Sequence, residues 1–479
     1  MKTKKLFSGW VVAILFLFAF NNAKANNVVI TGTSVSGSNI TFNIGWDNSW
    51  NANVAPANWD AVWVFVKYQD CNTRDWAHAG LSTLATDHST SSPLQVDTTT
   101  DGKGVFIRLS GLGGGTVAPT SVTLKMTIPA GSYNYKVFGI EMVNVPQTTF
   151  ELGDGISGGT FNSINVTSAM ETTGITAAVL GAGASNVPGA YPVGFNSFYA
   201  MKYEISQLQY VEFLNSLTYT QQKAHTINDP IGAIGTYAFS NSSRNGIRIS
   251  SPGNNAATPA VYACDLVNLV ENNIDDGQSI AAGFLAWTDV AAYLDWSALR
   301  PMSELEFEKL ARGNMPRLAA EYAWGTTDLN YVFSFGLVNA GKPNEKPTAV
   351  LNGLSNVYVN GNSIQAPVKV GFSASNSSGR LSAGAGFYGA MELTGNLYEL
   401  VINTTVEGVA FNGTLGDGTL SLTGNANQAT WPSVTTGLGA GFRGGAFDNF
   451  ESAARTSSRS QITSASTGRT NSFGGRGVR

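Results

Sequence analysis

The chain has 479 residues, a hydrophobic fraction of 43% and a formal charge of −4, with only 13% of its residues charged. This length exceeds that of one ordinary domain, so we expect two. The sparse and nearly balanced charge argues against non-specific binding to nucleic acid. The 54 glycines indicate short strands and many turns rather than long helices.

The first 25 residues have the features of a secretory signal peptide. Three lysines precede an apolar run at residues 10–20, and Ala23 and Ala25 form a small-x-small cleavage site. The alternative is an uncleaved membrane anchor, but the run is shorter than the roughly 20 residues that span a bilayer. We therefore expect an exported protein (periplasmic, at the cell surface or extracellular) without a transmembrane segment after signal cleavage.

Residues 26–147 are expected to form an all-β domain. Runs rich in β-branched and aromatic residues alternate with clusters of Gly, Pro, Asn, Asp and Ser. We expect strands at 39–46, 61–68, 105–109, 122–128 and 133–143. Several strands at this spacing favour a β-sandwich of the immunoglobulin-like type.

Four tryptophans lie near the start of this domain: Trp46, Trp50, Trp59 and Trp63. As a group they could form a platform on which a ligand stacks, and Trp63 is the candidate residue for such a surface. The alternative is that they pack in the core or at an interface.

Residues 148–479 are expected to form a second domain of glycine-rich loops with a few short helices. Apolar residues at helical spacing predict helices at 207–217, 288–296 and 303–312. Ser303 and Glu306 have the spacing of a capping box, which predicts that the third helix begins there.

Cysteine and histidine are scarce in the chain. Cys71 and Cys264 are the two cysteines, and either a disulfide between them or two isolated thiols would fit the sequence. The three histidines are scattered, with none in the C-terminal half. This argues against a multi-histidine metal centre or a histidine-based triad in the second domain.

Two segments near the C-terminus carry a family resemblance. Residues 386–400 read GFYGAMELTGNLYEL, and residues 442–449 read FRGGAFDN. They resemble the GLYDMxGNVWEW and RGGS boxes of the formylglycine-generating (sulfatase-modifying factor) family. Similar boxes occur in the family's order. Those at 198–206, 286–293, 300–308, 311–313 and 322–325 precede these two segments, and that at 477–479 follows them. The resemblance covers residues 150–479 and implies an α+β fold of the C-type-lectin-like kind with little regular secondary structure.

The reactive centre that the resemblance implies is missing from this chain. The family's oxidases bind Cu(I) through two cysteines that follow the RGGS box, as suits a soft metal ion. Here Ala446 stands at the usual serine, Asn449 at the first cysteine and Tyr398 at the usual tryptophan, and no cysteine occurs at 448–452. An amide can neither hold Cu(I) nor exchange disulfides. We therefore expect a degenerate domain without copper and without formylglycine-generating activity.

The resemblance also implies a calcium loop. Carried over by position, Glu392 and Glu399 would supply carboxylates, and Gly395 and Leu397 backbone carbonyls. Oxygen-only ligation completed by water is the chemistry that Ca²⁺ prefers. The alternative is that Glu399 caps a turn or pairs with an arginine such as Arg443 or Arg455.

The C-terminal tail is rich in arginine, and Arg443, Arg455 and Arg459 are candidates for a ligand surface. Guanidinium groups match the oxyanions of a sulfated or acidic glycan. The alternative is that these arginines tie irregular loops together through hydrogen bonds to backbone carbonyls.

These observations favour a secreted, non-catalytic binding or assembly protein of the bacterial cell envelope, with an envelope or surface protein or a glycan as its partner. Relatives of this kind occur among gliding-motility and type IX secretion components. One alternative is a formylglycine-generating-type oxidase for sulfatase maturation. The other is a carbohydrate-binding protein that uses the tryptophan-rich sandwich.

Overall fold

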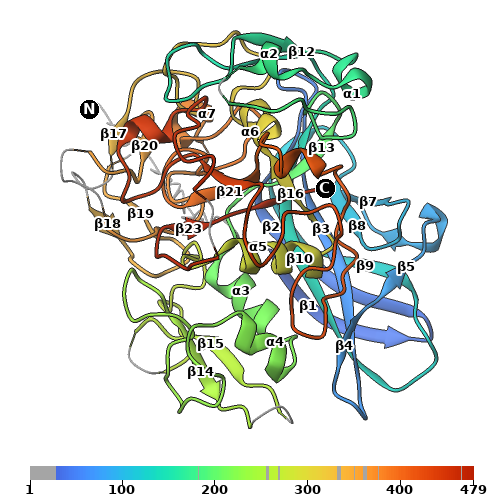
Figure 1. The fold of residues 1–479 in the computed structure, drawn as a ribbon. Helices are drawn as coiled ribbons and strands as arrows, with labels where there is room; N and C mark the ends of the chain where they lie inside the picture. Colours follow the sequence, from blue (N-terminus) through green and yellow to red (C-terminus); the bar gives the residue numbers. More distant parts are fainter. Residues whose placement is uncertain are drawn as a thin grey trace, which may run out of the picture.

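The computed structural model describes residues 28–181, 183–254, 258–267, 270–331, 336–349, 351–359, 364–375, 377–464 and 467–479. The expected signal peptide at residues 1–25 lies outside this range. Within it, the chain has a mixed α/β fold of mostly short strands and few helices (Figure 1).

One sheet is built from the first part of the chain alone. Its strands run in the order β1-β2-β9-β5, and β6 also pairs with β9. The strands are β1 (Val29–Ser36), β2 (Asn39–Asn51), β5 (Gly80–Leu81), β6 (Ser89–Thr90) and β9 (Gly113–Thr127). All of these pairs are antiparallel.

A second, 11-stranded sheet runs through both parts of the chain, in the order β22-β21-β16-β24-β13-β10-β3-β8-β7. Beside this path, β23 pairs with β21 and β4 with β3. The strands from the first part are β3 (Asp60–Asp70), β4 (Trp76–His78), β7 (Leu94–Thr98), β8 (Val105–Leu109) and β10 (Tyr133–Val145). Those from the second part are β13 (Phe198–Met201), β16 (Arg300–Ser303), β21 (Tyr398–Ile402), β22 (Ala440–Arg443), β23 (Phe473–Gly474) and β24 (Gly477–Val478). The two parts meet at the antiparallel pair of β10 and β13, where Met142 lies opposite Met201.

Strand β3 is buried on both faces, which explains its unbroken apolar sequence. Val62, Val64 and Val66 point into the core between the two sheets, with residues such as Phe42 of β2. The alternate residues, among them Phe65, point into the core of the second part of the chain. The five expected strands are confirmed as β2, β3, β8, β9 and β10, and the two sheets pack as a sandwich. Its immunoglobulin type stays a prediction.

The three expected helices are confirmed as α3, α5 and α6. The helices are α1 (Met170–Thr173), α2 (Ala177–Leu180), α3 (Gln207–Leu214), α4 (Tyr219–Ala224), α5 (Trp287–Trp296), α6 (Glu304–Arg312) and α7 (Arg380–Ala383). The capping box of α6 is also confirmed, because the Ser303 side chain accepts from the Glu306 N–H at 3.1 Å and Glu306 accepts from the Ser303 N–H at 3.0 Å.

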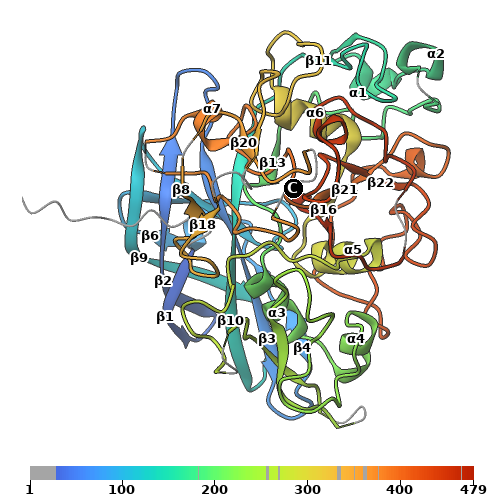
Figure 2. The same cartoon turned by 90° about the vertical axis from the view of Figure 1, so that its left-hand side faces the viewer.

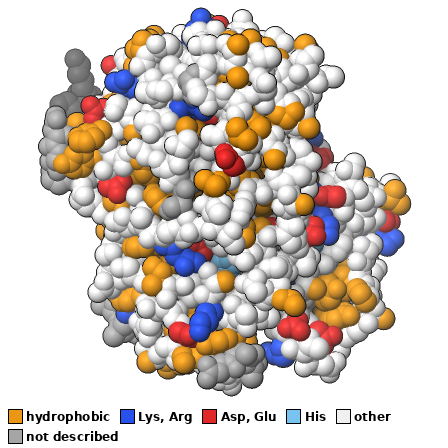
Figure 3. Space-filling view, in the orientation of Figure 1, with side chains coloured by type: hydrophobic (Ala, Val, Ile, Leu, Met, Phe, Trp, Pro, Cys, Tyr) orange, Lys and Arg blue, Asp and Glu red, His pale blue; other side chains and the backbone are white. Residues whose placement is uncertain are grey.

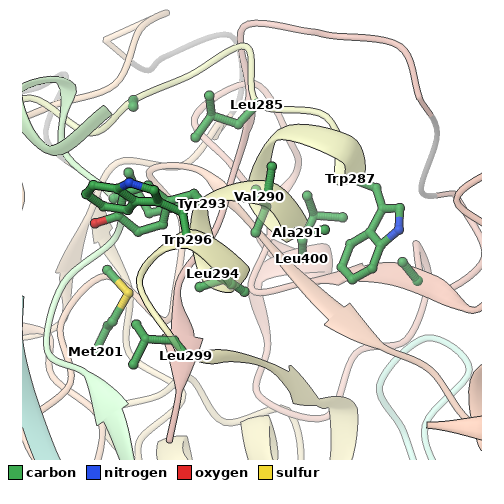
Figure 4. Close-up of a cluster of buried hydrophobic side chains, with 14 of the residues drawn as sticks. Met201, Leu285, Trp287, Val290, Ala291, Tyr293, Leu294, Trp296, Leu299 and Leu400 are labelled. Atoms are coloured by element: carbon green, nitrogen blue, oxygen red, sulfur yellow. The ribbon is translucent and has the colours of Figure 1, made fainter. Parts of the chain in front are cut away.

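Helix α5 lies at the centre of the second core. Its apolar side chains include Trp287, Val290 and Trp296, which extend in different directions around the helix (Figure 4). The Trp296 ring makes edge contacts with Phe65 and Phe138 of the large sheet at 5.1 and 4.9 Å. Strands β3 and β10 therefore lie between the β1-β2-β9 layer and the helices (Figure 2).

The remaining elements are short and connected by long loops. The strands are β11 (Phe150–Leu152), β12 (Ile164–Val166), β14 (Ile247–Ser251), β15 (Val261–Cys264), β17 (Asn330–Tyr331), β18 (Leu337–Val338), β19 (Lys346–Pro347) and β20 (Leu354–Ser355). Within the described ranges, short 3₁₀ helices occur at η1 (Ala85–Asp87), η3 (Gly408–Ala410) and η4 (Glu451–Ala454). Charged side chains are few and widely spaced on the face shown in Figure 3. Over the ranges described above, no helix has both the length and the apolar character needed to cross a bilayer.

Candidate functional site

Helix α6 carries charged side chains that are buried and paired with arginines. Arg443 donates to Glu304 Oε2 at 3.0 Å and to Glu308 Oε1 at 2.8 Å. Arg459 Nε donates to Glu304 Oε2 at 2.7 Å, and Arg312 Nη1 donates to Glu308 Oε2 at 3.0 Å. We call these five residues the α6 cluster.

The α6 cluster corrects the prediction of an arginine-lined ligand surface. Arg443 has no exposed surface and Arg459 is 4% exposed, so neither faces a ligand. Burial alone would raise the pKa of Glu304, but the guanidinium groups of Arg459 and Arg443 outweigh it and hold this pKa below its usual value. The arginines do tie loops together, as the alternative proposed, but carboxylates of a helix are their main partners.

Trp63 is likewise part of the interior. Its side chain is fully buried, and its Nε1 donates to the Ser297 carbonyl at 2.9 Å. The Arg479 guanidinium lies 4.0 Å from the centroid of its ring. The candidate ligand surface therefore does not include Trp63, which packs in the core as the alternative expected.

The three degenerate active-site positions do meet in space. Tyr398, the first residue of β21, donates its hydroxyl hydrogen bond to Asn449 Oδ1. The Asn449 N–H donates to the Ala446 carbonyl at 3.0 Å, and the Asn449 carbonyl accepts from Tyr358 N–H at 3.0 Å. Burial, together with the nearby Asp448 carboxylate, raises the pKa of Tyr398 and keeps its hydroxyl a neutral donor.

The two thiols of the chain are free and lie elsewhere. Cys71 is exposed at the end of β3, whereas Cys264 is buried in β15, opposite Ile247 of β14. Burial raises the pKa of Cys264 well above its usual value, so this thiol stays protonated and unreactive. The sequence left a disulfide open, and the structure places these residues as isolated thiols.

The surface around Asn449 carries exposed aromatic area. Phe450 is 64% exposed, and its ring makes an edge contact with Tyr358 at 5.3 Å. Arg455 is half-buried nearby in the chain and hydrogen-bonds to Tyr322, while its Nε has no partner among the described residues. Of the three arginines proposed for a ligand surface, Arg455 alone retains partial exposure.

The expected calcium loop is buried and contains unsatisfied oxygens. Glu399 Oε1 accepts from Arg476 Nε at 2.6 Å, and Glu392 Oε1 accepts from the Gly371 N–H at 2.8 Å. The second carboxylate oxygen of each glutamate is buried, and the described part of the chain offers it no hydrogen-bond donor. Glu399 does pair with an arginine, but the partner is Arg476 rather than Arg443 or Arg455.

Sequence reasoning missed a third carboxylate in this region. Glu204 is fully buried and accepts from the Leu397 N–H at 2.9 Å and from the Asn396 side-chain amide. Its position within the family box at 198–206 was the one feature of the sequence that could have indicated a role for Glu204. We call Glu204, Glu392, Glu399 and Arg476 the loop cluster.

The loop cluster has more negative charge than its cations balance. Burial raises the pKa of Glu392 to about 7, although Arg476 and Lys369 act against this shift. Burial and repulsion from the neighbouring carboxylates also raise the pKa of Glu204, and burial raises that of Glu399. Each carboxylate is therefore harder to ionise than it would be in water.

The backbone of this loop is held in an unusual conformation. Glu392, Gly395 and Asn396 have φ angles of 53°, 75° and 65°. A Cβ at Gly395 would lie 2.5 Å from Ser355 Oγ, so no other residue fits there. Left-handed backbone at a residue such as Glu392 costs of order 1–2 kcal/mol and persists where surrounding contacts fix it, often at ligand sites.

The donor atoms of the loop fit Ca²⁺. The unpaired oxygens of Glu392 and Glu399 are ligands of the chemical type that Ca²⁺ prefers, and a calcium site that joins them to the carbonyls of Gly395 and Leu397 stays a prediction. No three His, Cys, Asp or Glu side chains in the described ranges are arranged to hold a metal ion. A cation here would therefore depend on backbone carbonyls and water as well as on the two carboxylates.

A buried histidine–aspartate pair also occurs in the second part of the chain. His225 Nδ1 lies 2.9 Å from Asp289 Oδ1, and Arg469 also pairs with Asp289. The other ring nitrogen of His225 lies 2.8 Å from the Gly424 carbonyl oxygen. A carbonyl in this position accepts a hydrogen bond and holds the imidazole in place, so the pair has a structural role and is not a catalytic base.

Comparison with known proteins identifies a family that covers most of the chain. A family model described as the sulfatase-modifying factor enzyme 1-like domain matches residues 140–479. Among solved structures, the Treponema denticola variable protein 1 is 10% identical, with 71% of this chain and 95% of that chain covered at a TM-score of 0.29. This score is too low to carry an argument. No curated protein matches the chain.

Proposed function

Since the chain belongs to the family of the sulfatase-modifying factor enzyme 1-like domain, we propose that it is an exported, non-catalytic binding or assembly protein of the bacterial cell envelope. The observation that carries this proposal is the hydrogen bond between Tyr398 and Asn449 at the degenerate active-site positions. A phenol and an amide that satisfy each other leave neither a thiolate nor a free base there.

Oxidase chemistry of the family's kind would need two thiols at this place. The resemblance puts Asn449 at the first of them, and the buried, protonated Cys264 lies in a different hairpin. Oxygen- and nitrogen-containing amide groups are poor ligands for Cu(I). The same argument excludes neither a metal-free binding role nor calcium.

We place the binding surface at Phe450, Tyr358, Asn449 and Arg455. Phe450 is exposed and contacts the partly exposed Tyr358, and the half-buried Arg455 lies nearby in the chain. Aromatic residues and arginine are enriched at the centres of protein interfaces. An envelope or surface protein is therefore the proposed partner. This assignment agrees with the relatives of gliding-motility and type IX secretion systems that the family resemblance suggests.

Calcium and the type of the sandwich complete the proposal. Ca²⁺ held by Glu392, Gly395, Leu397 and Glu399 would fix the loop that precedes β21 and would supply no chemistry beyond charge compensation. The two antiparallel-stranded layers formed by β1, β2 and β9 and by β10, β3 and β8 support an immunoglobulin-like class for the first part of the chain.

The catalytic alternative has a direct test. The purified protein is incubated with Cu(I), oxygen and a cysteine-containing sulfatase peptide, and the peptide mass is followed. We expect the cysteine to remain unchanged. Formation of formylglycine would overturn the proposed function.

The binding surface is tested by capture from the native envelope. Phe450→Ala and Arg455→Gln should each weaken recovery of a specific partner relative to the wild-type protein. Leu422→Ala is the matched control, because Leu422 is 92% exposed and distant in sequence from the surface. Equal recovery by all four proteins would place the partner elsewhere and refute this surface.

A further inference from the structure

A groove of about 620 Å³ lies where the sandwich meets the second part of the chain. The lining from the sandwich includes Asn48–Trp50 and Gly114–Gly115, and the lining from the other side includes Ser378–Arg380 and Ala385–Gly389. Lys202 and Tyr203, which directly follow β13, also line it. Helix α7 lies next to the upper ends of the sandwich strands in Figure 2. The volume is within the range of pockets that bind small organic ligands.

Trp50 supplies a fixed aromatic face in this groove. Its Nε1 donates to Asn58 Oδ1 at 3.1 Å, and its ring lies against the backbone of Gly389, where a Cβ would be only 2.8 Å from Trp50 Cη2. Lys202 Nζ lies 4.8 Å from the centroid of the Trp50 ring, and the residue as a whole is partly exposed. Phe387, also partly exposed, and Tyr388 extend the aromatic lining on the opposite side.

The charged lining of the groove is entirely cationic. Lys202 and Arg380 line it, and no Asp or Glu does. The charge of Lys202 is balanced from behind by Glu141 at 3.1 Å and Asp60 at 3.3 Å. Arg380 is the cation of the groove lining that makes no ion pair with a described residue.

Arg380 differs from nearly all other arginines of this protein. The described arginines other than Arg74, Arg380 and Arg455 each take part in an ion pair. Two backbone carbonyls accept from Arg380 Nη2, but its Nε is buried without a partner in the described ranges. Its guanidinium lies 5.3 Å from the centroid of the Phe387 ring. Burial lowers the pKa of Arg380, and the charge of Glu321 opposes this shift without forming an ion pair with it. A partly desolvated cation without a direct ion-pair partner favours an anionic ligand.

We propose that this groove binds a short acidic oligosaccharide, with a sugar ring on Trp50 and a carboxylate or sulfate group on Arg380. A sugar ring combines an apolar C–H face with a rim of hydroxyl groups. The groove has groups that match both features. Trp50 provides an aromatic face for the C–H groups, and the side chains of Asn58, Ser375 and Ser378 can hydrogen-bond to hydroxyl groups. The guanidinium of Arg380 matches an anionic group. The proposal rests on the proposed binding function and gives it a ligand class at a second site.

The test is titration calorimetry with trigalacturonic acid, its neutral methyl ester and a sulfated chondroitin disaccharide. We expect the wild-type protein to bind at least one of the acidic ligands and to bind the ester at least about tenfold more weakly, because a charge-assisted pair is lost. Trigalacturonic acid carries carboxylates alone, whereas the chondroitin disaccharide carries a sulfate in addition to its uronate carboxylate, so tighter binding of the disaccharide would favour sulfate as the preferred anion.

Variants locate the binding to the groove. Arg380→Gln should weaken the acidic ligand about tenfold or more and leave the methyl ester unaffected, and Trp50→Ala should weaken both. Arg380→Lys keeps the charge and should fall between. The matched controls are Arg317→Gln and Trp59→Ala, which lie outside the groove and should bind as the wild-type protein does. Thermal unfolding of each variant separates lost binding from lost folding.

Three results would overturn the proposal. They are no binding of any saccharide at millimolar concentration, equal binding of the acid and its ester, or binding of an acidic peptide in place of the saccharides. Formylglycine formation with intact saccharide binding would instead refute the non-catalytic function and leave the groove standing. Loss of partner capture in Phe450→Ala with intact saccharide binding would show that the two sites act independently.

Discussion

The α6 cluster and the loop cluster both consist of buried glutamates and arginines, but the pKa shifts of their glutamates have opposite signs. In the α6 cluster, three arginines surround Glu304 and Glu308, and the pKa of Glu304 is held below its usual value. In the loop cluster, Arg476 is the single guanidinium among three carboxylates, whose pKa values are all raised. Burial alone therefore does not distinguish a structural charge cluster from a candidate ligand site. The two clusters differ in the balance between their carboxylates and the cations around them.

Removal of one arginine from the α6 cluster should have the largest effect. Arg443→Met leaves Glu304 and Glu308 buried with one cation fewer, which should lower the free energy of unfolding by about 3–5 kcal/mol. Urea denaturation of the purified variant measures this loss. Arg317→Met is the control, because the Arg317–Glu151 pair is over 30% exposed on average and should cost less than about 1 kcal/mol. Similar losses in both variants would contradict the comparison.

Calcium should stabilise the loop cluster and leave the α6 cluster unaffected. At about 100 times the dissociation constant, a ligand that binds only the folded state adds about 2.7 kcal/mol of stability. We expect calcium, and magnesium much less, to raise the melting temperature of the wild-type protein. Glu399→Gln should abolish this rise. Unchanged melting at millimolar calcium would contradict a calcium site in this loop and leave Arg476 and Lys369 as its balancing charges.

The pH dependence of stability should report the two clusters separately. The pKa of Glu392 is raised from 4.5 to about 7, so without divalent ions its contribution is fully present below about pH 4.5 and is lost as the pH rises through 7. The pKa of Glu304 is lowered, so its contribution is present above the ordinary value of 4.5 and is lost as the pH falls below it. Glu392→Gln should remove the loss of stability near neutral pH and preserve the loss in acid. Unfolding curves measured from pH 3 to 8 would show whether the two slopes separate in this way.

The smallest effect is expected at the degenerate active-site positions. Tyr398→Phe removes the hydroxyl that donates to Asn449 and should cost about 1 kcal/mol, because a single neutral hydrogen bond is lost. Denaturation together with partner capture measures both stability and function. Capture that survives this change would agree with a binding surface that depends on Phe450 rather than on the Tyr398 hydroxyl.

Local sequence patterns were sufficient for much of the fold. The alternation of β2 and the apolar run of β3 identified strands, and the Ser303–Glu306 spacing located the start of α6. The resemblance also brought Tyr398 and Asn449 together correctly. These features depend on neighbouring residues or on a conserved order of boxes, which a single chain displays.

The partners of the buried charges could not be predicted in this way. Arg443 lies 139 residues from Glu304, and Arg476 lies 77 residues from Glu399. Glu304 and Glu308 appeared in the sequence only as parts of a helix start, so nothing local linked them to the arginine-rich tail. Trp63 was ambiguous for the same reason. Its burial depends on Ser297 and Arg479, which contact it in the fold although both lie far from it in the sequence.

The antiparallel pairing of β10 with β13 joins the sandwich to the rest of the protein through one continuous sheet. Cutting the chain after residue 147 would expose the edge of β10 on one fragment and that of β13 on the other, and unpaired edges of this kind promote aggregation. The two regions should therefore melt in one cooperative transition. In evolutionary terms, replacing the β-rich segment with an unrelated domain would require a new strand that pairs with β13.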